Sequence, residues 1–73
     1  MTSGGAYYQG YLDQINQAAA AYNASNKQSG TDDVTLTKTL VAVMAAANND
    51  SNQGNLTTTD MYNLNEAAKA AMP

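Results

Sequence analysis

The chain has 73 residues, which is room for one small domain. It contains no cysteine and no histidine, which excludes disulfide bonds, thiolate metal sites and the usual nucleophilic triads. Three lysines, no arginine and a net charge of −3 argue against nucleic acid and anionic membrane surfaces as partners, because both attract clusters of cations.

Residues 6–25 are predicted to form the first helix, after a flexible N-terminal tail of residues 1–5. Large or apolar side chains recur along it at spacings of 4, 3, 4 and 3 residues, which is typical of a helix that packs against other helices. A polar loop of residues 26–31 follows, in which Gly30 is able to take the left-handed conformation. The stripe consists of Tyr8, Leu12, Ile15, Ala19 and Tyr22, and Tyr11 widens it.

Residues 34–48 are predicted to form the second helix. Asp32 and Asp33 come just before it, where negative charge favours a helix N-terminus. Its first half, residues 34–41, is rich in β-branched residues and alternates in the manner of a strand. A lone strand has nothing to pair with in one chain, so we predict helix, and the strand alternative stays open for an assembly. The helical stripe is Leu36, Leu40, Val43 and Ala47, with Met44 beside it.

A second polar loop, residues 49–55, leads to a third predicted helix over residues 57–72. Thr57 is placed as its N-cap, with Asp60 three residues later in the spacing of a capping box. Leu56 before the cap and Met61 after it are placed for a hydrophobic staple, and Leu64 continues the apolar face. The sequence therefore predicts an all-α chain, a small helical hairpin or a three-helix arrangement with polar Asn/Ser/Gly loops.

This single domain, residues 1–73, is poor in large apolar side chains. Leu, Ile and Val number nine and Phe is absent, whereas alanine occurs 14 times. An alanine methyl removes little apolar area from water, so a small chain of this composition has a limited core. We therefore expect an isolated copy to be marginally stable and other chains to supply the missing burial.

Catalysis, cofactors and membrane insertion are not expected from this sequence. The six acidic residues are scattered, and the adjacent pair Asp32 and Asp33 is explained by its place at a helix start. No apolar run approaches the length of a transmembrane helix. We predict that the chain is not an enzyme, binds no metal or cofactor, and acts on no small-molecule substrate.

The composition is rich in Ala, Asn, Thr, Gln and Ser and lacks Cys, His, Trp and Arg. It resembles that of small bacterial proteins that are exported unfolded to build extracellular helical filaments, above all the type III secretion needle and pilus subunits. Residues 8–22, the loop at residues 29–31 and residues 36–47 are similar to the helical hairpin of that family. The resemblance implies a subunit secreted without a cleaved signal peptide; a cytoplasmic location is the alternative.

The resulting hypothesis is a structural subunit that assembles with copies of itself into a secreted filament. Its helix stripes would form the contacts, without nucleic acid or membrane insertion. The alternative is a soluble three-helix protein-binding module, such as a secretion adaptor, a phage inhibitor or a small toxin. The predicted subunit interface consists of Tyr8, Tyr11, Leu12, Ile15, Ala19, Tyr22, Leu36, Leu40, Val43, Met44, Met61 and Leu64.

Overall fold

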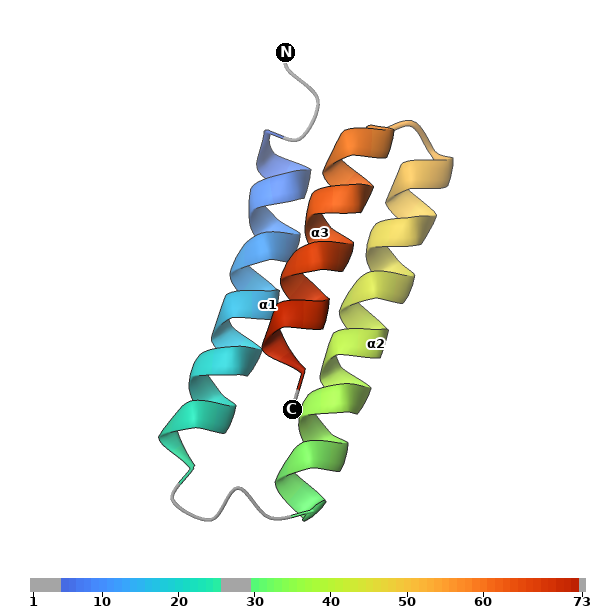
Figure 1. Ribbon diagram of the computed structural model, residues 1–73. Coiled ribbons are helices and arrows are strands. Elements are labelled where there is room, and N and C mark those ends of the chain that lie inside the picture. The colour runs from blue at the N-terminus through green and yellow to red at the C-terminus, as the bar shows by residue number, and fades with distance from the viewer. Residues whose placement is uncertain (1–4, 26–29, 73) are drawn as a thin grey trace.

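Three helices run up, down and up along one another in the part of the chain that the computed structural model describes, residues 5–25 and 30–72 (Figure 1). Helix α1 spans Ala6–Ala24, α2 spans Gly30–Asn52 and α3 spans Thr58–Ala71. Each helix packs against the other two, and the bundle measures 42 × 17 × 14 Å. The predicted all-α, three-helix arrangement is confirmed.

The core lies along the axis where the apolar stripes of the three helices meet. Each helix contributes one large side chain that is almost fully buried: Ile15 is 1% exposed, and Leu40 and Leu64 are 0% exposed. Alanine occupies other core positions, where its small side chain lets two helix backbones approach closely. No polar or charged residue of the described chain is buried there. The buried core residues are Ile15, Leu36, Leu40, Val43, Ala47, Leu56, Leu64 and Ala68.

Helix α2 extends beyond its predicted bounds of residues 34–48 at both ends. Because it begins at Gly30, Asp32 and Asp33 lie inside its first turn, where their negative charge interacts favourably with the positive end of the helix dipole. Gly30 does not use the left-handed conformation that is open to it, since it is the first residue of the helix. Residues 34–41 are helical throughout, so they form no strand in this chain.

Two other predicted segments fall partly where the structure gives no description. The flexible N-terminal tail, apart from Gly5, and residues 26–29 of the first loop lie outside the described residues. The second predicted loop, residues 49–55, is shorter than expected because α2 continues to Asn52.

The corner between α2 and α3 is fixed by its own hydrogen bonds. Gly54 has a φ of 83°, a left-handed conformation that only glycine adopts easily. Its N–H donates to the carbonyl of Ser51 at 3.0 Å, and the N–H of Asn55 donates to the carbonyl of Asp50 at 2.9 Å. These bonds satisfy carbonyls at the end of α2 that have no partner inside the helix.

The predicted capping box at the start of α3 is confirmed. The N–H of Asp60 donates to the Thr57 hydroxyl oxygen, and the N–H of Thr57 donates to the Asp60 carboxylate, each at 3.0 Å. Leu56 is buried and Met61 packs against the same core cluster, as the predicted staple requires. Local sequence therefore sets where α3 begins and how the chain enters it.

Candidate functional site

The residues predicted to form a subunit interface lie inside this one chain. Tyr8, Tyr11, Leu12, Ala19, Tyr22, Met44 and Met61 are partly buried, and Ile15, Leu36, Leu40, Val43 and Leu64 are buried. Apart from Ala19, all of them belong to or pack against a single core cluster. The two stripes that were expected to meet neighbouring copies therefore meet each other and α3, and the buried members offer no surface to a second chain.

Sequence reasoning missed a second, partly apolar stripe on α2, here called the outer stripe: Val34, Lys38, Val41, Ala45 and Asn48. These residues also follow spacings of 4, 3, 4 and 3, but they start two residues before the buried stripe and so lie on the opposite side of the helix. Val34 is 53% exposed and Val41 is 57% exposed. The spacing of these residues is visible in the sequence, but residues 34–41 also alternate in the manner of a strand, and this second pattern conceals the helical one.

A shallow depression extends the outer stripe towards α3. Val41, Met44, Ala45 and Asn48 line it from α2, at the i, i+3, i+4 and i+7 positions that surround a hole on a helix surface. Met61 and Asn65 of α3 complete its wall. The depression presents methionine and small side chains, which adapt to the shape of an incoming group.

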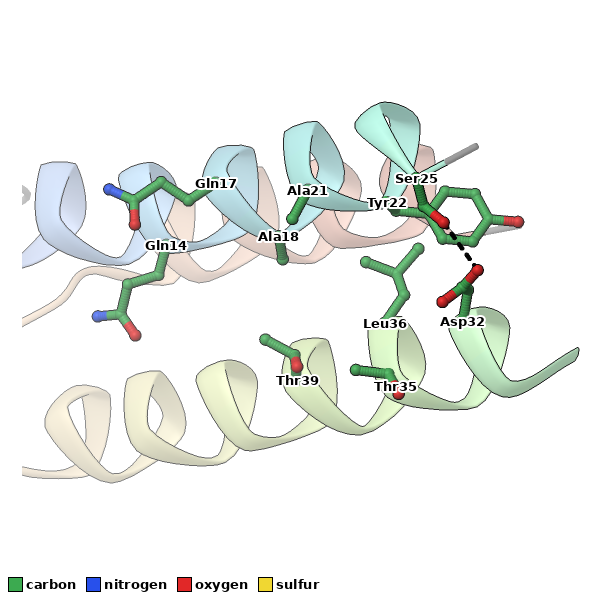
Figure 2. Close-up of a pocket in the computed structure, with 10 residues that line it drawn as sticks. All are labelled: Gln14, Gln17, Ala18, Ala21, Tyr22, Ser25, Asp32, Thr35, Leu36 and Thr39. Carbon is green, nitrogen blue, oxygen red and sulfur yellow. Dashed lines mark hydrogen bonds between the residues drawn. The ribbon is translucent and has the colours of Figure 1, made fainter. Parts of the chain in front are cut away.

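A larger groove of about 520 Å³, here called the α1–α2 groove, is lined by these two helices alone (Figure 2). Ala18, Ala21 and Leu36 give it an apolar floor, and the amides and hydroxyls around them give it a polar rim. Of the described residues that line it, Asp32 is the single charged one. The full lining is Gln14, Gln17, Ala18, Ala21, Tyr22 and Ser25 of α1, with Asp32, Thr35, Leu36 and Thr39 of α2.

Hydroxyl groups of α1 donate hydrogen bonds to carboxylates near both ends of α2. The Tyr11 hydroxyl donates to Asp50, whose other oxygen accepts a bond from the Asn55 side chain at 3.2 Å. At the other end of the hairpin, the Tyr22 hydroxyl donates to Asp33.

Beside that second pair, the Ser25 hydroxyl donates to Asp32 at 2.8 Å (Figure 2). These bonds fix the register of α1 on α2, because a shift of one helix turn would separate every pair.

Both tyrosines of these pairs hold their protons more tightly than an ordinary tyrosine. The hydrogen bond to Asp50 raises the pKa of Tyr11 to about 12, and burial and the negative charge of Asp50 act in the same direction. The hydrogen bond to Asp33 raises the pKa of Tyr22, again with help from burial and from the nearby carboxylates. Each pair is therefore stable only while the phenol is protonated.

We expect the bundle to lose stability as pH rises from 10 towards 12. The unfolded chain releases its tyrosine protons near pH 10, whereas folded Tyr11 releases its proton at about 12. Stability from this pair is therefore complete below pH 10 and is lost as pH rises through the folded pKa. Thermal melts followed by circular dichroism over this pH range measure the loss.

Two variants test the cause of that alkaline loss. Tyr11→Phe should lower stability at neutral pH by about 1 kcal/mol, a low value for a bond to a charged acceptor because the pair is only partly buried. It should also reduce the alkaline loss. Tyr62→Phe is the control, since Tyr62 is 63% exposed on α3. An equal alkaline loss in the wild type and Tyr11→Phe would contradict the role of this bond.

The described residues contain no group of three or more acidic side chains that could hold a metal ion. None of the helices in this part of the chain combines the length and the apolar character needed to cross a bilayer. Comparison with protein-family models, curated proteins and solved structures finds no match. A proposal for the function therefore rests on the outer stripe and the α1–α2 groove.

Proposed function

We propose that this protein is a non-catalytic structural subunit that acts by packing its helices against further copies of itself. A filament is the form of assembly that the sequence resemblance favours. The observation that supports this proposal most is that α2 carries large apolar residues on both of its sides. One side is buried in the core, and the other exposes Val34, Val41 and Ala45.

A helix that carries large apolar residues on both of its sides is usually packed against other elements on both sides. Around the exposed valines, the surface of α2 consists mainly of Thr, Ala and Asn, and Lys38 is its one charged residue between Val34 and Asn49. A second helix can cover this side without burying a carboxylate. The long aliphatic stem of Lys38 allows its ammonium group to remain in water.

The exposed stripe is small, so a single contact is expected to be weak. Covering the exposed half of each valine contributes roughly 1 kcal/mol. Association of two free molecules costs about 4 kcal/mol or more before any contact is counted. The two valines alone therefore do not offset this cost, and a stable assembly requires further contacts in each interface and several interfaces for each copy.

A soluble binding module for another protein is the second candidate. The self-contained core favours it, because Ile15, Leu40 and Leu64 are covered by the chain's own helices. Such a module would use the same outer stripe, with a helix of a different protein as its partner. The two candidates differ in whether the chain associates when it is pure.

Val41→Lys is expected to abolish self-association. Wild-type protein should show a mass that rises with concentration from about 10 µM to about 1 mM in light scattering, since a weak interface populates only at high concentration. The variant should remain a monomer, because it places a second cation beside Lys38 in the stripe. Its circular dichroism melt should match the wild type, since Val41 is 57% exposed.

Tyr62→Lys provides the matched control, because it changes an equally exposed large residue on α3. It should associate as the wild type does. A wild-type chain that remains a sharp monomer up to about 1 mM would contradict self-assembly and favour the second candidate.

A further inference from the structure

The α1–α2 groove is a partly apolar hollow of about 520 Å³ that lies open on the surface of the described chain. We propose that it receives the outer stripe of a second copy, so that copies join head to tail. This inference rests on the proposed function and adds to it the surface that the stripe contacts.

Both helices offer the groove a hole of the kind that receives a side chain from another helix. Gln14, Gln17, Ala18 and Ala21 of α1 occupy i, i+3, i+4 and i+7 positions. On α2, the same spacing joins Asp32, Thr35, Leu36 and Thr39. On the α1 side the floor consists of Ala18 and Ala21, whose small side chains permit a close approach of a third backbone.

The outer stripe has the length and the spacing to enter this groove. Val34 and Val41 are seven residues apart, or about 10 Å along a helix, and the α1 side of the groove runs for about 17 Å from Gln14 to Ser25. Either valine can lie over Ala21 while Lys38, about one turn away, lies at the Asp32 end. The incoming helix can therefore enter the groove in either direction, with Val34 over Ala21 in one direction and Val41 over Ala21 in the other.

The charges of the two surfaces are complementary. Among the residues that the structure describes, Asp32 is the one charged residue lining the groove, and Lys38 is the one charged residue of the outer stripe. A stripe that packed against another stripe would bring two lysines together, whereas a stripe in a groove brings Lys38 near a carboxylate. This difference favours a second copy in the groove over a symmetric contact between stripes.

The stripe and the groove share no residue, so one copy can use both at the same time. A contact between two different patches is heterologous, and repeating it adds copies until the chain closes into a ring or grows as an open helix. Closure into a ring makes the last contact intramolecular and so offsets the weakness of each one, whereas open growth adds every copy through a single contact of this kind.

A charge exchange tests the pairing. Lys38→Glu alone and Asp32→Lys alone should each associate about tenfold more weakly than the wild type, because each sets like charges against one another. An equimolar mixture of the two variants should recover association, since each stripe then finds a groove of opposite charge. Light scattering and sedimentation measure these affinities, and thermal melts verify that each variant is folded.

Disulfide trapping gives a second test that does not depend on Asp32, which also accepts a hydrogen bond from Ser25. The chain has no cysteine, so a pair of single variants reports one contact only. Val34→Cys and Val41→Cys are each mixed with a size-tagged Ala21→Cys chain under mild oxidation. One of the two should give a mixed dimer well above the Asn63→Cys control, an exposed site on α3.

The outcomes separate this inference from the proposed function. Association of the wild type, with no recovery in the charge-exchanged mixture and no mixed disulfide above the control, overturns the groove as acceptor and leaves self-assembly standing. Tighter association of the wild type with Lys38→Glu, together with normal behaviour of Asp32→Lys, also overturns it and indicates contact between stripes. A wild type that never associates overturns both.

Discussion

Leu40→Ala is expected to destabilise the bundle by about 3 kcal/mol, because it removes three buried carbon atoms and leaves a cavity that the helices fill incompletely. Leu40 is 0% exposed, lies near the middle of α2 and belongs to the central cluster. A 73-residue domain typically has a total stability of about 4–10 kcal/mol, so the loss is a large fraction of it. Urea denaturation followed by circular dichroism measures the change.

Val41→Ala is the matched control for this substitution, since Val41 follows Leu40 and points away from the core. It should change the stability of the dilute protein by less than about 0.5 kcal/mol. Equal effects of the two substitutions would mean that the interior of α2 is not where the structure places it.

Ala47→Leu is expected to destabilise the chain by about 2 kcal/mol or more, although it adds apolar area to a chain that has little. Ala47 is 0% exposed, and the core around it has no space for three further carbon atoms. Accommodating the larger side chain requires the helices to separate and so weakens the contacts of their neighbours. Thermal and urea denaturation should both show the loss.

Ala46→Leu makes the same chemical change one residue earlier, on the exposed surface. It should leave stability almost unchanged, because the added side chain extends into water and leucine is a good helix former. A gain of stability in Ala47→Leu would contradict close packing at this position and indicate a loosely filled core.

The parts of the fold that local chemistry determines could be predicted from the sequence. The third helix was placed within one residue at either end, because Thr57 and Asp60 form a capping box whose two bonds depend only on neighbouring residues. The apolar periodicities also identified which sides of α1 and α2 are buried.

The early start of α2 could not be predicted from local patterns. Gly30 is a weak helix former, and the β-branched residues that follow favour strand. The first turn is instead supported by α1, through the bonds of Tyr22 to Asp33 and of Ser25 to Asp32. Such bonds depend on how the helices pack, which no spacing within α2 encodes.

Periodicity also could not distinguish a neighbouring helix of the same chain from one of another copy. The predicted interface residues are buried or partly buried because the stripes of the three helices of a single chain cover one another. Counting large side chains understated this core, since Ala47 and Ala68 contribute by letting helices approach rather than by their own area. That an isolated copy is marginally stable stays a prediction.

Helix α3 is the shortest of the described helices and stops at Ala71, while the end of α1 and the start of α2 continue past it (Figure 1). Backbone amides in this two-helix end are expected to exchange their hydrogens with solvent through local opening, well before the whole chain unfolds. NMR should find faster exchange in residues 20–24 and 30–34 than in residues 40–47; uniform exchange would contradict this. The chain would then be rigid where all three helices pack together and more mobile at the end that α1 and α2 form alone.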